Sequence, residues 1–171
     1  MRHRSALRLS APLWILIAVA CDRRVESSPE APVDSTSPAT SGAAPAVVWG
    51  EDIPAALQQA EQTGKLVLLN FTGTKWCQPC IRMEKHTFST KEFAEYAEKK
   101  LVLVKVDFPD PVNFNPETIK IAEKYMGEIQ LPTYVMLDAA GKRLGETSAQ
   151  PDTKTFLGEL DKLAAKASVA K

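Results

Sequence analysis

Two of the three cysteines in this 171-residue chain, Cys77 and Cys80, are separated by only two residues. Cysteines at this spacing can form a disulfide, exchange it with a disulfide in another protein, or contribute to a metal site. Trp76 precedes the pair and Pro79 lies within it. Which of these reactions the pair supports depends on the structure around it.

The pair follows a predicted strand and opens a predicted helix. We therefore expect Cys77 at the helix amino terminus, facing solvent, and Cys80 one turn further in. There the helix macrodipole and free backbone N–H groups stabilise a thiolate, which makes Cys77 the expected nucleophile. Cys80 is placed to attack the mixed disulfide that Cys77 forms with a substrate, and Pro79 fits in the first helical turn.

Metal chemistry fits the sequence less well. A structural zinc site needs four ligands, but the chain has no second cysteine pair and its only histidines are His3 and His86. A copper site made by both thiolates and Met83 stays open, as does a purely structural disulfide. The prediction is no metal site and no cofactor.

The rest of the carboxy-terminal region alternates helices and strands, which predicts an α/β domain with a mixed sheet of four to five strands flanked by helices. Its periodicity and turn residues predict strands over 65–71, 101–107, 133–137 and 142–146, and helices over 54–63, 90–97, 116–126 and after Pro151.

Two motifs in this region are similar to those of thioredoxins. Residues 76–80 read Trp-Cys-Gln-Pro-Cys and resemble the thioredoxin Trp-Cys-Gly-Pro-Cys, while residues 131–133 read Leu-Pro-Thr and resemble the loop with its cis-proline. The resemblance implies a thioredoxin-like fold and a redox disulfide between Cys77 and Cys80. It also implies that Trp76 packs under the active-site loop and that Pro132 is cis, beside backbone that pairs with an extended substrate segment.

Residues 71–77 and 84–89 are similar to bacterial envelope thioredoxin-like proteins and to the carboxy-terminal domain of the thiol:disulfide interchange protein DsbD. Thioredoxins carry a buried aspartate in the strand before the motif, where this chain has Asn70, which does not titrate. Glu84 matches an acidic residue of the DsbD domain and is the candidate substitute for proton transfer. The alternative for Glu84 is a solvated glutamate paired with a nearby lysine; Lys105 lies where thioredoxins often place one.

The amino-terminal region predicts export. Three arginines and an apolar run over 11–20 indicate a signal peptide over residues 1–20, too short for a span of about 18 or more apolar residues. Cys21 follows a small residue, which resembles the lipobox of bacterial lipoproteins and implies lipidation of Cys21 and a membrane anchor. Ordinary cleavage that leaves a free thiol stays open. Asp22 favours the inner membrane over the outer by the enterobacterial sorting rule.

Residues 21–46 are rich in Pro, Ser, Thr and Ala, a composition that predicts a disordered tether between the anchor and a domain over 47–171. The formal net charge is +0, so no basic field favours nucleic acid.

These features predict a thiol–disulfide oxidoreductase on the periplasmic side of the bacterial cell envelope. It would reduce or exchange disulfides in exported proteins and receive electrons from a membrane protein similar to DsbD. Pro79 resembles the reducing members, whose potentials are about −270 mV rather than the roughly −120 mV of strong oxidants. Two alternatives stay open: a reductase for cytochrome c maturation, and a non-catalytic tethered binding module or copper chaperone.

Overall fold

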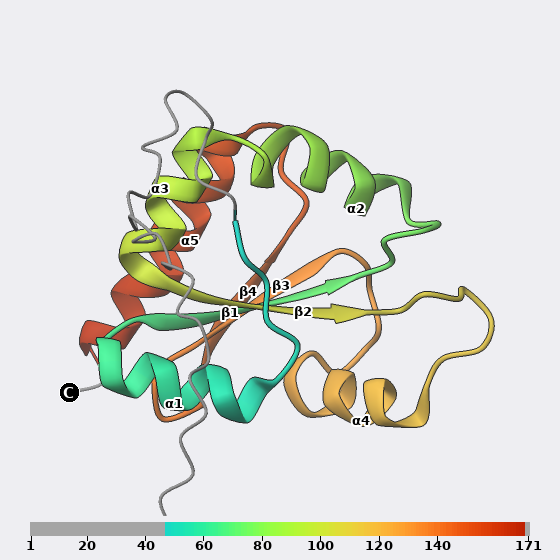
Figure 1. Cartoon of the computed structure of the whole chain (residues 1–171), viewed down its shortest axis with the longest axis horizontal. Helices are drawn as coiled ribbons and strands as arrows, with labels where there is room; N and C mark the ends of the chain where they lie inside the picture. The colour runs from blue at the N-terminus through green and yellow to red at the C-terminus, as the bar shows by residue number, and fades with distance from the viewer. Residues whose placement is uncertain (1–46, 170–171) are drawn as a thin grey trace, which may run out of the picture. The chain divides into compact units, whose positions relative to one another are not determined.

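The computed structural model describes residues 47–169. The predicted signal peptide, the lipidation site at Cys21 and the tether lie outside these residues. The described part of the chain forms a mixed four-stranded sheet, in the order β2-β1-β3-β4, with helices on both faces (Figure 1). The predicted α/β class is therefore confirmed.

The central strand is β1, which pairs in parallel with β2 and antiparallel with β3, and β3 pairs antiparallel with the edge strand β4. Their bounds are Leu66–Thr72 for β1, Leu101–Asp107 for β2, Thr133–Leu137 for β3 and Arg143–Ser148 for β4. Since Thr72 pairs with Asp107 and Phe71 with Thr133, the ends of β1 and β2 meet the start of β3 at one edge of the sheet. The loops attached there lie together at the right-hand end of the sheet in Figure 1.

The helices are α1 (Ile53–Thr63), α2 (Gln78–Met83), α3 (Lys91–Lys100), α4 (Pro116–Tyr125) and α5 (Thr153–Val169). Asp52 caps α1 by accepting a hydrogen bond from the Ala55 N–H at 2.8 Å, and Gly64 ends it at φ 69°. A π-helical turn, η1 (Glu84–Phe88), follows α2 directly. It was not predicted, because an apolar pattern does not report the insertion of one residue into a helix.

Each face of the sheet carries its own hydrophobic core. Side chains from alternate positions of β1, such as Val67 and Leu69, pack with α1 and α4 in what we call the α1/α4 core. Leu68 points the other way, into the α3/α5 core. The α3/α5 core is built around four rings whose adjacent centroids lie 4.8 to 6.2 Å apart: Phe88, Phe93, Tyr134 and Phe156.

The outer edge of β2 is partly covered by the segment before α1. Gly50 donates a hydrogen bond to the Leu103 carbonyl at 2.9 Å and accepts one from the Lys105 N–H at 2.8 Å. This single bridge takes the place of a fifth strand, so the described sheet has the lower of the two predicted strand numbers. Among the described residues, no helix has the length and apolar character needed to cross a membrane.

Candidate active site

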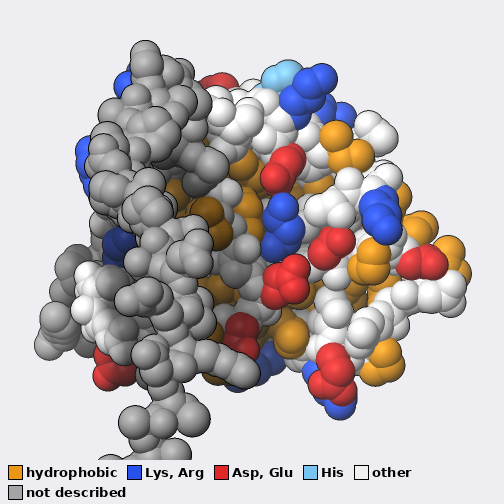
Figure 2. Space-filling view, viewed as in Figure 1, with side chains coloured by type: hydrophobic (Ala, Val, Ile, Leu, Met, Phe, Trp, Pro, Cys, Tyr) orange, Lys and Arg blue, Asp and Glu red, His pale blue; other side chains and the backbone are white. Residues whose placement is uncertain are grey.

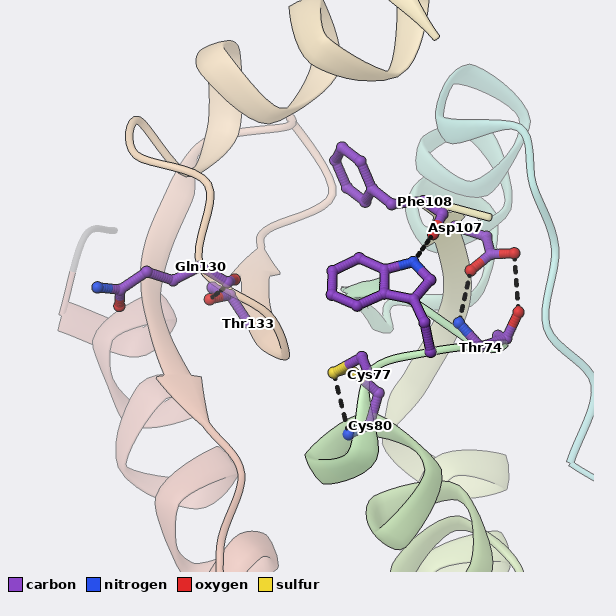
Figure 3. The surroundings of a disulfide bond; sticks show 8 residues. Thr74, Cys77, Cys80, Asp107, Phe108, Gln130 and Thr133 are labelled. Carbon is purple, nitrogen blue, oxygen red and sulfur yellow. Dashed lines mark hydrogen bonds between the residues drawn. A yellow bond between two sulfur atoms is a disulfide. The ribbon is translucent and has the colours of Figure 1, made fainter. Parts of the chain in front are cut away.

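Cys77 and Cys80 form a disulfide at the start of α2. Their sulfur atoms are 2.00 Å apart and their Cα atoms 5.2 Å apart. Cys77 is the N-cap of α2, and its Sγ accepts a hydrogen bond from the Cys80 N–H at 3.3 Å (Figure 3). Pro79 occupies the first turn. The predicted position of the pair at a helix amino terminus is confirmed.

The exposure of Cys77 differs from the prediction. Cys77 is only 4% exposed and Cys80 3%, although Cys77 was expected to face solvent. In the disulfide each sulfur atom covers the other, and the neighbouring Trp76 packs against the α1/α4 core. The oxidised form therefore presents little of either sulfur to solvent.

Trp76 fixes the loop that carries Cys77. Its indole N–H donates a hydrogen bond to the Phe108 carbonyl at 2.7 Å. Gly73 lies against the face of the ring, since a Cβ atom at this position would be 2.8 Å from Trp76 Cε2. The Gly73 carbonyl also accepts a hydrogen bond from the Cys77 N–H at 2.9 Å. Any side chain at Gly73 would displace the ring or the cysteine loop.

A second connection joins the same loop to the end of β2. The Asp107 carboxylate accepts hydrogen bonds from the Thr74 N–H and the Thr74 hydroxyl, each at 2.9 Å (Figure 3). The sequence did not predict Gly73, Thr74, Asp107 or Phe108 as site residues. The one available signal was the Asp107 carboxylate at the end of a buried strand, because the carboxyl ends of neighbouring parallel strands meet at one sheet edge.

The loop before β3 lies at the same edge of the sheet as the Cys77–Cys80 disulfide. Its Leu131–Pro132 peptide bond is cis, as the resemblance to thioredoxins implied. Thr133 donates a hydrogen bond from its hydroxyl to the Gln130 carbonyl at 2.7 Å, which closes the turn (Figure 3). Because Thr133 pairs with Phe71, the turn with Pro132 lies at the sheet edge that also holds the Cys77 loop.

A polar group lies beneath α2, on the sheet face that carries the α3/α5 core. Asn70 is 1% exposed, and its side-chain oxygen has no hydrogen-bond partner among residues 47–169. In the strand register Asn70 is flanked by Lys105 and Tyr134. Burial, together with the negative charge of Glu84, raises the pKa of Tyr134 above its ordinary value. The position that resembles that of the thioredoxin aspartate thus holds a buried amide whose oxygen has no hydrogen-bond partner among the described residues.

Glu84 lies at the rim of this group. Its Oε1 is 3.4 Å from Lys105 Nζ, and the two side chains are 50% and 24% exposed, respectively. Within the described chain, the hydrogen-bond partner of the Glu84 carboxylate is Lys105, and neither cysteine is among its partners. The arrangement is that of the lysine-paired glutamate considered as the alternative for Glu84.

The described residues include no group of three or more His, Cys, Asp or Glu side chains placed to hold a metal ion.

Comparisons with known proteins agree with this geometry. A family model described as thioredoxin-like matches residues 48–139. The disulfide bond reductase DsbH of Chlamydia pneumoniae is 34% identical over 108 residues, which cover 59% of this chain and 63% of the relative, under two thirds of its length.

Two solved structures are also similar. The structure of a DsbH oxidoreductase matches with a TM-score of 0.62 and 27% identity, over 71% of this chain and 86% of that chain. The carboxy-terminal domain of Neisseria meningitidis DsbD matches with a TM-score of 0.52 and 20% identity, over 67% of this chain and 98% of that one. At that identity the second likeness shows the fold alone.

Proposed function

Because the chain belongs to the thioredoxin-like family, we propose that it is a thiol–disulfide oxidoreductase of the bacterial cell envelope that reduces or exchanges disulfides in exported proteins. The observation that carries this proposal is the Cys77–Cys80 disulfide at the start of α2, at the same sheet edge as the Pro132 loop.

The reaction begins with the reduced form of the chain. The Cys77 thiolate attacks one sulfur of a substrate disulfide, forms a mixed disulfide and expels the other substrate sulfur as a thiolate. The Cys80 N–H, which points at Cys77 Sγ from 3.3 Å, is placed to stabilise the Cys77 thiolate before attack. Little ordering is needed at that step, because the donor belongs to the helix itself.

The second step returns the site to the form in the structure. Cys80, as a thiolate, attacks the Cys77 sulfur of the mixed disulfide and releases the second substrate thiolate. Two electrons have then passed to the substrate, and the Cys77–Cys80 disulfide has formed. A dithiol donor must reduce this disulfide before the next cycle, and we propose a membrane protein similar to DsbD for that role.

Cys80 must lose its proton during this cycle, and position 70, which resembles that of the thioredoxin aspartate, holds an amide. We propose that the Glu84–Lys105 pair supplies the missing ionisable group. Lys105 lies on the sheet face against which α2 packs, and Glu84 directly follows α2. Both side chains reach solvent, so protons can exchange with water.

Substrate access is the proposed role of the loop before β3. An extended substrate segment would pair with the backbone beside Pro132 and bring its disulfide to Cys77. Trp76 and Pro79 then act as positioning residues, since Trp76 holds the Cys77 loop and Pro79 shapes the first turn of α2.

The proposed location depends on the amino-terminal sequence. A signal peptide over 1–20, lipidation at Cys21 and a tether to residue 46 would hold the domain on the periplasmic side of a membrane, with the inner membrane favoured by Asp22. The name of the curated relative, a disulfide bond reductase, supports the reducing direction.

A mixed-disulfide trap tests the proposed function. In the Cys80→Ser variant of the full chain, expressed in a bacterial envelope, the second step is blocked, so exported proteins should accumulate as reducible adducts of Cys77. The Cys77→Ser variant is the matched control and should trap none. Absence of adducts, together with failure of the wild-type chain to reduce a small neutral disulfide, would establish a binding module instead. Adducts made only of apocytochromes would establish the cytochrome c alternative.

The direction of transfer has its own test. Equilibration of the chain with glutathione mixtures should give a reduction potential nearer to about −270 mV than to roughly −120 mV. A value above about −150 mV would show that the chain is an oxidant and would contradict the reducing direction.

A further inference from the structure

A cleft of about 310 Å³ lies beside the redox pair, between α2 with its π-helical turn and the connection from β4 to α5. Pro79, Arg82, Met83 and His86 line one wall, and residues 149–151 line the other. Pro79 lies between the two cysteines in the sequence, so the cleft adjoins the residues that react. We call it the basic cleft.

The walls of the basic cleft are held in place by hydrogen bonds. The Thr153 hydroxyl, at the start of α5, donates to the His86 carbonyl at 3.2 Å and so joins the two walls. On the second wall, the Gln150 amide donates to the Thr147 hydroxyl and to the Ser148 carbonyl, each at 3.3 Å. Met83 is only 3% exposed. The shape is therefore formed before any partner binds.

The charge at the rim is positive and is not neutralised within the cleft. Arg82 and His86 are exposed, and none of the described residues that line the cleft is acidic. Within residues 47–169 Arg82 takes part in no ion pair. Figure 2 shows Lys or Arg side chains at the upper edge of the molecule, where Figure 1 places α2.

The two nearest carboxylates in the sequence have other partners. Glu84 pairs with Lys105 on the sheet side of the helix. Asp152 accepts hydrogen bonds from the Thr155 N–H at 2.9 Å and its hydroxyl at 2.8 Å, an interaction that caps α5 and lowers the pKa of Asp152. Neither lines the cleft, so the Arg82 guanidinium keeps its full capacity to bind a carboxylate from outside.

We propose that the basic cleft binds an aspartate or glutamate side chain of the partner polypeptide, close to the disulfide that the partner presents to Cys77. This inference rests on the proposed function and adds a specificity site to it. A guanidinium binds a carboxylate through paired N–H donors, and the exposed imidazole adds a further donor. Partners with an acidic residue beside the exchanging cysteine are thereby selected over those with a basic one.

The test compares three synthetic peptides that differ at one residue beside a single intramolecular disulfide: Glu, Gln or Lys. The reduced full chain is mixed with each, and the rate constant for formation of the reduced peptide is measured at low and high salt. Wild type should prefer the Glu peptide over the Lys peptide by about fivefold to tenfold at low salt, and salt should weaken this preference. In the Arg82→Gln/His86→Gln variant the ratio should fall to about one.

Charge reversal and a matched control sharpen the test. Arg82→Glu should invert the order, so that the Lys peptide reacts faster than the Glu peptide. Lys85→Gln removes the same charge from the same helical segment, at a residue outside the cleft, and should retain the wild-type preference. An equal loss of preference in Lys85→Gln would show a general field effect and overturn the proposal.

Failure of the proposal is distinguishable from failure of the proposed function. If wild type reduces all three peptides at equal rates, the exchange activity stands and the cleft proposal is overturned. If wild type reduces none of them, both are overturned.

Discussion

The two faces of the sheet support the two cysteines in different ways. On the α1/α4 side, Trp76 and Leu131 pack against the core at its margin, and the Cys77 loop is fixed by hydrogen bonds to the end of β2. On the α3/α5 side, Met83 and Phe88 are fully part of the core, so the helix that carries Cys80 is fixed by apolar packing.

This difference separates stability from reactivity. Removal of one ring from the α3/α5 core lowers the free energy of unfolding, and none of the four rings belongs to the loop that carries Cys77. The hydrogen-bonded loop buries less apolar surface and sets the position of Cys77 directly. Substitutions on the two sides should therefore affect different measurements.

The largest expected effect is on the free energy of unfolding, for a substitution on the α3/α5 side of the sheet. Phe93 is fully buried and its ring contacts those of Phe88 and Phe156, with centroids 4.8 and 6.2 Å away. Phe93→Ala should lower the free energy of unfolding by about 3–5 kcal/mol. Urea unfolding of the oxidised chain measures this value. Leu137→Ala, equally buried in the α1/α4 core, is the matched comparison and should cost less, because no ring–ring contact is lost. An equal or greater cost for Leu137→Ala would contradict the distinction between the cores.

The next largest expected effect is on activity, for a substitution on the α1/α4 side, where hydrogen bonds fix the Cys77 loop. Gly73→Ala places a methyl group 2.8 Å from the Trp76 ring, so the ring must shift and Cys77 with it. We expect kcat/KM for a small neutral disulfide to fall by about tenfold to 100-fold, because such reactions depend on the placement of the attacking atom to within about 1 Å. Gly158→Ala is the control: a methyl group there meets no atom within 4 Å, and activity should be unchanged. Wild-type kinetics in Gly73→Ala would show that the ring contact does not position Cys77.

The α3/α5 side, where apolar packing dominates, was easier to predict from the sequence. Its helices carry apolar stripes and the strands, which both faces share, are apolar runs, so the bounds of β2 agree with the prediction and those of β1 differ by one residue. The cysteine pair and Pro132 were also found, because short motifs carry them. These signals are local, and each can be read from a few neighbouring residues.

The hydrogen bonds that fix the Cys77 loop on the α1/α4 side were harder to predict, because the residues that they join are far apart in the chain. Thr74 and Asp107 are 33 residues apart, and Trp76 and Phe108 are 32 apart. Whether a carbonyl such as that of Phe108 accepts an indole N–H depends on loop geometry that no residue pattern encodes. The prediction that Cys77 faces solvent was wrong for a similar reason, since the exposure of Cys77 depends on the disulfide and on the packing of Trp76.

The polar group beneath α2 gives the third prediction. Asn70→Asp introduces a carboxyl group at a position that is 1% exposed. Burial should raise the pKa of this carboxyl above its value of about 3.9 in the unfolded chain. The folded state then binds the proton more tightly than the unfolded state, so stability relative to wild type is lost as pH rises through these two pKa values.

We expect Asn70→Asp to cost about 1–2 kcal/mol at pH 8 and less at pH 4, measured by urea unfolding. Gln58→Glu adds the same charge at an exposed position of α1 and should show no such pH dependence. An Asn70→Asp chain as stable as wild type at pH 8 would mean that Lys105 compensates the new charge in full.

The smallest expected effect is on stability at the outer surface of the α3/α5 side, where Asp161 of α5 contacts α3. Its carboxylate accepts hydrogen bonds from Lys100 Nζ at 2.8 Å and the Tyr96 hydroxyl at 2.9 Å, and the Lys100 bond in particular lowers the pKa of Asp161. The folded pKa lies below the unfolded one, so this stabilisation is present above the unfolded pKa and is lost as pH falls through the folded pKa. Because the Asp161 side chain is 55% exposed, Asp161→Asn should cost under about 1 kcal/mol at pH 7.

Unfolding curves of Asp161→Asn and wild type should therefore converge as pH falls below about 4. Glu159→Gln is the matched control, because the ion-pair partner of Glu159 within residues 47–169 is Lys162 of the same helix. If Asp161→Asn cost several kcal/mol, the packing of α3 against α5 would depend on this polar contact as much as on the rings of Phe93 and Phe156. Apolar packing would then no longer distinguish the α3/α5 side of the sheet from the α1/α4 side.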